Sequence, residues 1–134
     1  MLNELHAFVA KDSRHVALQG YENRTTVNVR VDCLAIADLP GVGFKPTYEQ
    51  CLTFVRHNIE AIHQIAETKL GNGECLPEDC DGRPGLGIRI DDVDFAEYVT
   101  IPGNRLSLAA FDPHTQIRWV PADRYFGNGG DHAA

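Results

Sequence analysis

The chain has 134 residues, of which 43% are hydrophobic and 23% charged, a balance typical of a soluble globular protein with its own core. Its formal charge of −7 argues against direct binding of nucleic acid, which requires a basic patch. Residues 1–15 carry Glu4, Lys11, Asp12 and Arg14 and no long apolar run, which argues against a secretory signal peptide or a membrane span. We therefore expect a cytoplasmic protein whose four cysteines are reduced. We expect one domain over residues 1–126 and a flexible tail at 127–134.

Two paired strands are predicted in the first third of the chain. The segment His15–Gln19 is short and β-like, and residues 21–26 supply turn chemistry. From Val27 to Ala35, apolar and polar side chains alternate with a period of two, which predicts a long half-buried strand. The Leu-Pro-Gly sequence at residues 39–41 ends it, because proline removes a ladder donor.

The middle of the chain predicts one long amphipathic helix. Thr47 and Gln50 have the spacing of a capping box, in which each side chain bonds the other residue's backbone amide. Apolar residues then recur at intervals of three and four from Leu52 to Ala66. Gly71 suits the left-handed position that follows a helix, so about six turns are expected.

The remainder of the chain predicts further strands. After a loop at residues 71–87, strand signals occur at residues 87–90, 98–101, 106–111 and 116–120. Residues 102–104 and 112–115 have turn chemistry. The expected order is β-β-α-β-β-β, an α+β fold in which one long helix packs on one face of an antiparallel sheet.

Four short motifs occur in a family-like order: Asp38-Leu-Pro-Gly41, Thr47-Tyr-Glu-Gln50, Glu60-Ala-Ile62 and Gly73-Glu-Cys-Leu-Pro77. Together, residues 14–80 resemble the N-terminal domain of HicB-type antitoxins. The resemblance implies a partial RNase H-like unit of β-β-β-α-β order. It also implies a role in binding a small, basic, RNA-cleaving toxin. Residues 81–134 show strand patterning where many members of that family carry a helical DNA-binding domain.

The excess negative charge is concentrated in residues 74–97, which contain eight acids and two bases. Such a stretch is the natural complement of a basic protein, although a merely solvated loop has the same composition. The predicted partner-binding residues are Glu74, Glu78, Asp79, Asp81, Asp91, Asp92 and Asp94.

These observations favour a non-catalytic, acidic inhibitor that neutralises a basic, nucleic-acid-acting protein. An antitoxin is the first form of this hypothesis. A phage-encoded anti-defence protein, such as an anti-CRISPR or a DNA mimic, uses the same electrostatic logic. Two other classes stay open: a divergent metal-dependent nuclease, and a protein that pairs with a second copy through exposed strands or the side bearing Leu34 and Ile36.

No cofactor or metal is expected from the cysteine, histidine and acid patterns. Cys75 and Cys80 lack a second close pair for zinc, and Cys33 and Cys51 fit core positions. A disulfide between Cys75 and Cys80 is geometrically possible but is not expected in a reducing compartment. His57, Glu60, His63 and Glu67 fit a hydrated helix face with a weak His63–Glu67 contact. The acids at residues 91–97 lack the glycine of a calcium loop, and Asp32 is the single strand acid for a nuclease centre.

Overall fold

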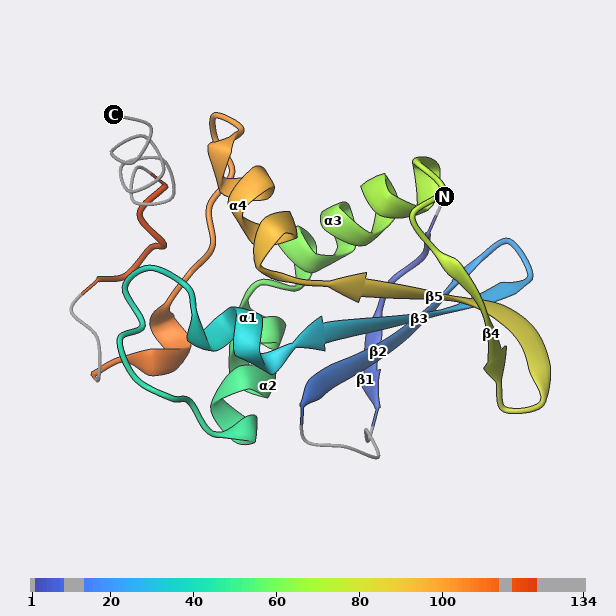
Figure 1. Ribbon diagram of the computed structural model, residues 1–134, viewed down its shortest axis with the longest axis horizontal. Coiled ribbons are helices and arrows are strands. Elements are labelled where there is room, and N and C mark those ends of the chain that lie inside the picture. Colours follow the sequence, from blue (N-terminus) through green and yellow to red (C-terminus); the bar gives the residue numbers. More distant parts are fainter. Residues whose placement is uncertain (1, 9–13, 114–116, 123–134) are drawn as a thin grey trace.

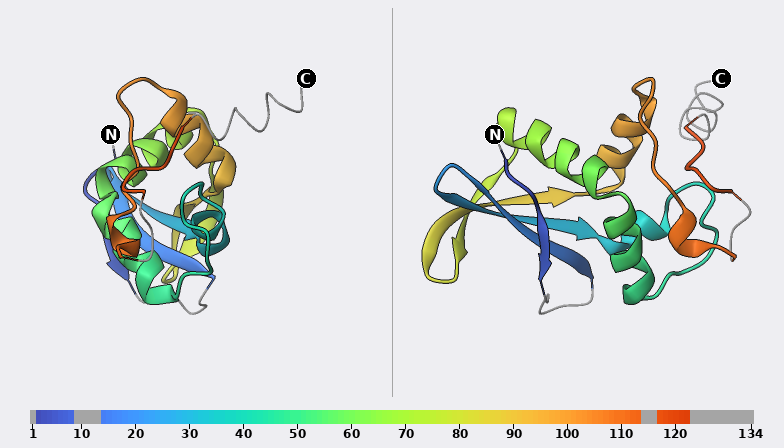
Figure 2. Two further views of the ribbon diagram at one scale, coloured as in Figure 1. Left: turned by 90° about the vertical axis from the view of Figure 1, so that its left-hand side faces the viewer. Right: turned by 180° about the vertical axis from the view of Figure 1, so that it is seen from behind.

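The computed structural model describes residues 2–8, 14–113 and 117–122 (Figures 1 and 2). Five strands form one sheet in the order β1-β2-β3-β5-β4, and three longer helices accompany it. The α+β class is thus confirmed. The predicted tail at residues 127–134 lies outside the described residues. The strands are β1 (His6–Phe8), β2 (His15–Glu22), β3 (Thr25–Asp32), β4 (Leu76–Cys80) and β5 (Arg83–Ile90). The helices are α1 (Cys33–Ala37), α2 (Tyr48–His57), α3 (Ile59–Gly71), α4 (Asp92–Thr100) and the 3₁₀ helix η1 (Ala109–Phe111).

The predicted N-terminal hairpin is confirmed, with a shorter second strand. Glu22 pairs with Thr25, so β2 and β3 are joined by a two-residue turn in which Asn23 has a φ of 56°. The alternate valines of β3 are fully buried, as the period of two predicts. The strand nevertheless ends at Asp32, whose carboxylate accepts a hydrogen bond from the backbone amide of Leu34 and starts α1. The predicted continuation to Ala35 is therefore wrong, because this local cap competes with the sheet ladder.

The sheet is mixed, which corrects the expected antiparallel arrangement. β3 and β5 are neighbours and run parallel, whereas the other three pairs are antiparallel. The long helical connection between β3 and β4 gives the chain room to return in the same direction. Residues 76–83, predicted as loop, form a tight hairpin whose turn is Asp81 and Gly82, with φ of 54° and 83°. An Asp-Gly pair with two positive φ values is the typical two-residue hairpin turn.

The single long helix predicted over residues 47–71 is two helices that point in different directions (Figure 1). Its beginning is confirmed: the Thr47 and Gln50 side chains form both bonds of the capping box. The break lies at Asn58, which is buried and leaves the helical region of φ and ψ. Its side-chain amide donates to Phe54 O and Ser107 O, and its Oδ1 accepts from Ser107 N. These bonds to a distant segment of the chain hold the backbone here outside the helical conformation, so the helix is interrupted.

The predicted strands after residue 90 are largely wrong. Residues 98–101 belong to α4 and its end, because Asp91 and Asp94 form a capping box that begins a helix there. Residues 106–111 make one isolated bridge, between Ser107 and Trp119, before η1. The predicted strand at 116–120 and the turn at 112–115 both extend into residues outside the described ranges.

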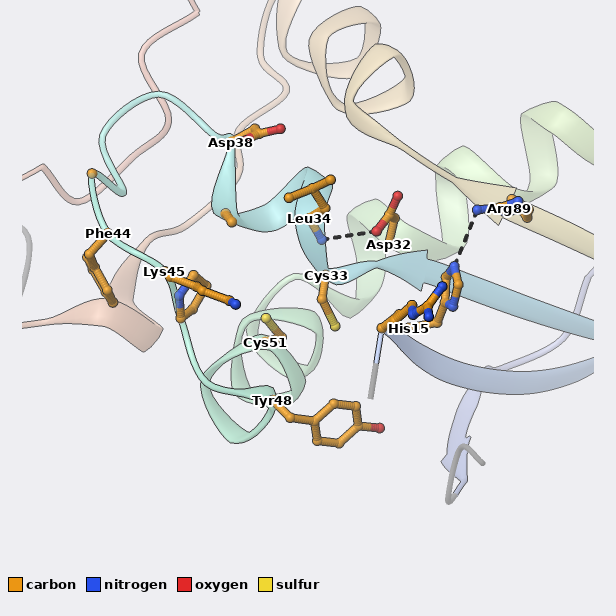
Figure 3. A pocket seen from close by; sticks show the side chains of 14 residues that line it. His15, Asp32, Cys33, Leu34, Asp38, Phe44, Lys45, Tyr48, Cys51 and Arg89 are labelled. Atoms are coloured by element: carbon orange, nitrogen blue, oxygen red, sulfur yellow. Dashed lines mark hydrogen bonds between the residues drawn. The ribbon is translucent and has the colours of Figure 1, made fainter. Parts of the chain in front are cut away.

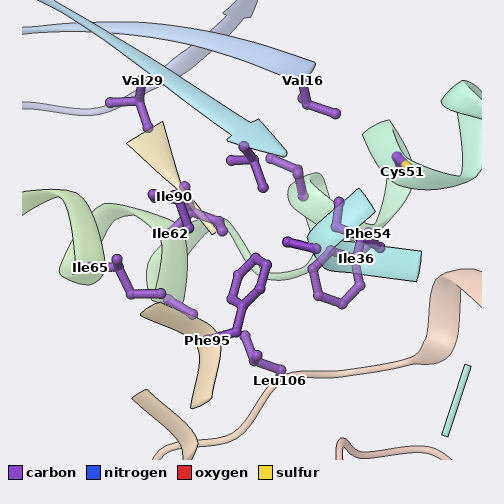
Figure 4. Close-up of a cluster of buried hydrophobic side chains, with 14 of the residues drawn as sticks. Val16, Val29, Ile36, Cys51, Phe54, Ile62, Ile65, Ile90, Phe95 and Leu106 are labelled. Carbon is purple, nitrogen blue, oxygen red and sulfur yellow. The ribbon is translucent and has the colours of Figure 1, made fainter. Parts of the chain in front are cut away.

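The core lies between the sheet and the helices, with α2 against β2 and α3 against β5. Figure 4 shows how the inward valines and isoleucines of the strands meet side chains of α2, α3 and α4. Three fully buried phenylalanines tie the helices together: the Phe54 ring lies 6.0 Å from that of Phe95 and 5.9 Å from that of Phe111, centroid to centroid. Ile36 is also fully buried while Leu34 is exposed, so the two do not form the shared apolar side considered for self-pairing. In the described part of the chain, no helix is both long and apolar enough to cross a membrane.

Candidate protein-binding site

The acidic stretch is divided in space by β5. Asp79 and Asp81 lie at the β4–β5 hairpin, whereas Asp91, Asp92 and Asp94 lie at the start of α4. The eight residues of β5 separate the two groups by about 25 Å, from the rise per residue of a strand. The seven predicted partner-binding residues therefore do not form one continuous patch.

Glu78 is engaged within the sheet. Its carboxylate crosses from β4 over β5 and accepts from both terminal nitrogens of Arg30, at 2.5 and 2.8 Å, and from the Asn28 side chain at 2.7 Å. Gly87 makes this crossing possible, since a Cβ there would lie 2.4 Å from a Glu78 carboxylate oxygen. The Arg30 guanidinium, with Asn28, lowers the pKa of Glu78 against the opposing effect of burial. Glu78 thus serves the fold on the face of the sheet away from the helices.

Asp94 and Asp91 build the start of α4. The Asp94 Oδ2 atom accepts from the Lys69 ammonium at 2.8 Å and from the Asp91 backbone amide at 3.0 Å. Lys69 also donates to Arg89 O at 2.7 Å, which joins α3, β5 and α4. Burial raises the pKa of Asp94 above its ordinary value even though Lys69 acts to lower it. The Asp91 Oδ1 atom accepts from the backbone amides of Val93 and Asp94.

Around these two carboxylates, α4 presents a surface that combines charge with apolar side chains. Val93 is 56% exposed and Ile101 is 52% exposed, and Glu97 lies between them at the i, i+4 spacing that puts all three on one side of the helix. A hollow of about 110 Å³ between α3 and α4 is bordered by Ile101, Glu97 and Glu74. We call this region the α4 surface; it consists of Glu74, Asp91, Asp92, Val93, Asp94, Glu97 and Ile101.

Val93, Glu97 and Ile101 are absent from the sequence-based set of site residues. The start of α4 could have been predicted from Asp91 and Asp94, because an acid three residues after an N-cap aspartate marks the start of a helix. A helical reading would have placed Val93, Glu97 and Ile101 on one face. The hollow itself depends on the packing of α3 against α4, which no local pattern specifies.

The residues considered for metal binding do not converge. Asp32 caps α1 at the end of β3, and Asp91 and Asp94 cap α4 at the neighbouring end of β5, so these carboxylates accept hydrogen bonds from backbone amides. Within the described ranges, no group of three or more histidine, cysteine, aspartate or glutamate side chains is arranged to hold a metal ion. Cys75 and Cys80 are free thiols, and burial raises the pKa of Cys80.

His63 has a structural contact that the sequence did not predict. Its Nε2 atom lies 2.7 Å from Leu2 O and 3.1 Å from Asn3 O, which ties the N-terminal segment to α3. The predicted weak contact with Glu67 is confirmed, with Nδ1 and Oε1 at 4.0 Å.

Comparison of the chain with known protein families, with curated proteins and with solved structures finds no match.

Proposed function

We propose that this chain is a non-catalytic binding protein that neutralises a basic protein through the α4 surface. The observation that carries the proposal is that the exposed apolar side chains of Val93 and Ile101 lie on the same side of α4 as Glu97, with further carboxylates at the start of the helix and across the hollow. Apolar anchors surrounded by charged groups are the usual composition of a protein interface, in which the anchors supply affinity and the charges supply rate and specificity.

The charge of the α4 surface defines the partner. It contains five carboxylates, and among the described residues that line the adjoining hollow, Lys69, which is paired with Asp94, is the one with a basic side chain. A surface with this excess of one sign attracts a protein rich in lysine and arginine, and the attraction weakens as salt screens it. A small nucleic-acid-acting effector has that composition, because it must bind phosphates. The HicB-like order of motifs supports an antitoxin as the specific form, and an anti-defence protein follows the same physics.

The hairpin group has a weaker claim to the same role. Asp79 and Asp81 are exposed, but Glu78 beside them is paired with Arg30, and Arg83 follows two residues after Asp81. We therefore assign the principal contact to α4 and not to the whole stretch of residues 74–97.

Reversing three charges of the α4 surface should abolish partner binding and leave the fold intact. The variant combines Glu74→Lys, Asp92→Lys and Glu97→Lys. All three residues are exposed, and among the described hydrogen bonds their carboxylates take no part in capping α4. We expect the apparent affinity for the partner, captured from a lysate of the source organism, to fall by at least about tenfold. Quantitative pull-down with mass spectrometry measures this.

The matched control is Glu4→Lys, Asp79→Lys and Glu49→Lys, which changes the net charge equally at exposed positions away from α4. We expect it to retain the partner, and circular dichroism should show that both variants are folded. Equal loss in both variants would mean that net charge, and not the α4 surface, governs capture. Equal retention in both would remove the basis of the proposal. The identity of the captured protein separates a toxin from a defence effector.

A further inference from the structure

A large cavity lies at the ends of β3 and β5 (Figure 3). It shares no lining residue with the hollow between α3 and α4. Its volume is about 900 Å³, within the range of pockets that hold small molecules. Its walls come from the start of β2, the end of β3, α1, residues 43–46 and the start of α2. Cavities at the carboxyl ends of parallel strands are the usual ligand sites of sheets with helical crossovers.

The side chains that line the cavity carry more positive than negative charge, whereas the chain as a whole is negative. Arg14, Lys45 and Arg89 line it, so that three of the chain's 12 lysines and arginines meet in one concave region of a protein with a net charge of −7. Two carboxylates also line it. One of them, Asp32, has an oxygen engaged by the Leu34 backbone amide as the cap of α1. The cavity therefore has a positive balance that the rest of the chain lacks.

The cationic groups are placed on facing walls. Arg89 Nη2 lies 3.3 Å from His15 Nε2. In the His15 tautomer whose Nε2 carries no proton, this nitrogen accepts a hydrogen bond from the guanidinium and holds it at the end of β5. Figure 3 shows Lys45 on the opposite wall of the cavity, with Cys33 and Cys51 between it and this pair. Cationic side chains on facing walls both attract an anionic ligand into the space between them, and arginine can bind its anionic group with two parallel hydrogen bonds.

The remaining lining is apolar or aromatic. Leu34 is 66% exposed and lies on the α1 wall, and Phe44 and Tyr48 contribute aromatic rings from the loop and from α2. Cys33 and Cys51 lie side by side at the base of the cavity, where a hydrogen bond between the two thiols and burial raise the pKa of Cys51. A ligand that filled this space would need an apolar body as well as a charged group.

We infer that this cavity binds a small aromatic anion, with its phosphate or carboxylate group attracted by Arg89 and Lys45 on facing walls and its ring against Leu34 and Tyr48. The inference is independent of the α4 surface, since the two regions share no lining residue. It assigns a ligand-binding activity to the protein in addition to binding a basic partner. Failure of one proposal leaves the other standing.

The test is a titration of the ¹⁵N-labelled protein with phenyl phosphate, followed by amide chemical shifts. We expect saturable shifts confined to residues 14–15, 32–34, 43–48 and 89. Arg89→Gln and Lys45→Gln should each weaken binding about tenfold, whereas Arg83→Gln, which removes the same charge at the β4–β5 hairpin, should not. Benzoate tests the carboxylate in place of the phosphate, and benzyl alcohol tests the ring without a charge.

Each other outcome overturns the inference. Binding of benzyl alcohol equal to that of both anions would show an apolar pocket without anion recognition. Equal weakening by Arg83→Gln would show nonspecific attraction to positive charge. Shifts that do not saturate, or that spread over the whole protein, would show that the cavity has no defined ligand. Lys45 is an exposed loop residue, so Lys45→Gln keeps the test valid should Arg89→Gln not fold.

Discussion

Replacing Asn58 with alanine is expected to lower the free energy of unfolding by about 3 kcal/mol. Asn58 is only 6% exposed, and its side chain makes three hydrogen bonds that no water can readily replace. Two of the bonded groups are the backbone N–H and C=O of Ser107, which the substitution leaves without their partner. Thermal unfolding should show a melting temperature lower by about 10 °C, given the size of the chain.

Asn72→Ala is the matched control, because Asn72 also follows the last residue of a helix but is exposed and makes one long bond of 3.4 Å. Its effect should stay within about 0.5 kcal/mol. Asn58→Asp keeps the acceptor for Ser107 N but loses both donated bonds, so its stability should also fall. A wild-type melting temperature for Asn58→Ala would show that the bonds to Ser107 do not hold the C-terminal segment.

Gly87→Ala is the second large effect, with an expected loss of about 2 kcal/mol. The added Cβ would occupy the path of the Glu78 carboxylate, at 2.4 Å from its oxygen, and must displace it from Arg30 and Asn28. Asn28 is buried, so its side-chain amide would lose its acceptor in a place that water reaches poorly. The ion pair between Glu78 and Arg30 adds little to this loss of stability, because both of its side chains are partly exposed. Chemical denaturation measures the difference.

A double-mutant cycle and a pH series identify the cause. In a Glu78→Ala background, Gly87→Ala should be nearly neutral, because the group it displaces is gone. The pairing with Arg30 lowers the pKa of Glu78, so the stability that Glu78 provides is complete above the ordinary glutamate pKa of about 4.3 and is lost as pH falls through the lower pKa of the folded protein. Gly87→Ala should flatten this acid-dependent loss. Additive effects in the cycle would contradict the proposed path of the carboxylate.

Features with a strong local signal were predictable from the sequence. The alternation of valines in β3 and the Thr47 capping box both correspond to observed elements, because burial on one side and a cap each act within a few residues. Two local signals were available but outweighed by others. The Asp81-Gly82 turn lies within the predicted loop at residues 71–87, and the capping box of Asp91 and Asp94 lies between the strands predicted at residues 87–90 and 98–101.

Other features of the fold depend on contacts between residues far apart in the chain, and no local sequence pattern specifies them. Asn58 ends α2 because its partner is Ser107, 49 residues later in the chain. Glu78 pairs with Arg30, 48 residues earlier, through the space that Gly87 leaves. The parallel pairing of β3 with β5 likewise depends on how the intervening helices pack. A period of two cannot distinguish a parallel from an antiparallel neighbour.

The candidate site could likewise be predicted from the sequence only in part. Composition identified a carboxylate-rich stretch at residues 74–97. It did not show that Glu78 and Asp94 are paired with basic side chains, or that Val93 and Ile101 stand exposed beside the remaining acids. Those distinctions require the fold, because charge pairing is decided by which strands and helices are neighbours.

The most direct test of the α4 surface is site-specific photo-crosslinking in lysate of the source organism. A photoreactive phenylalanine analogue replaces Val93 in one variant and Ile101 in another, and exposed Leu76 on β4 serves as the matched control. We expect the first two variants to crosslink to the same basic protein, the Leu76 variant not to crosslink to it, and high salt to abolish the product. Crosslinking from Leu76 alone, or to no protein from Val93 and Ile101, would contradict this expectation.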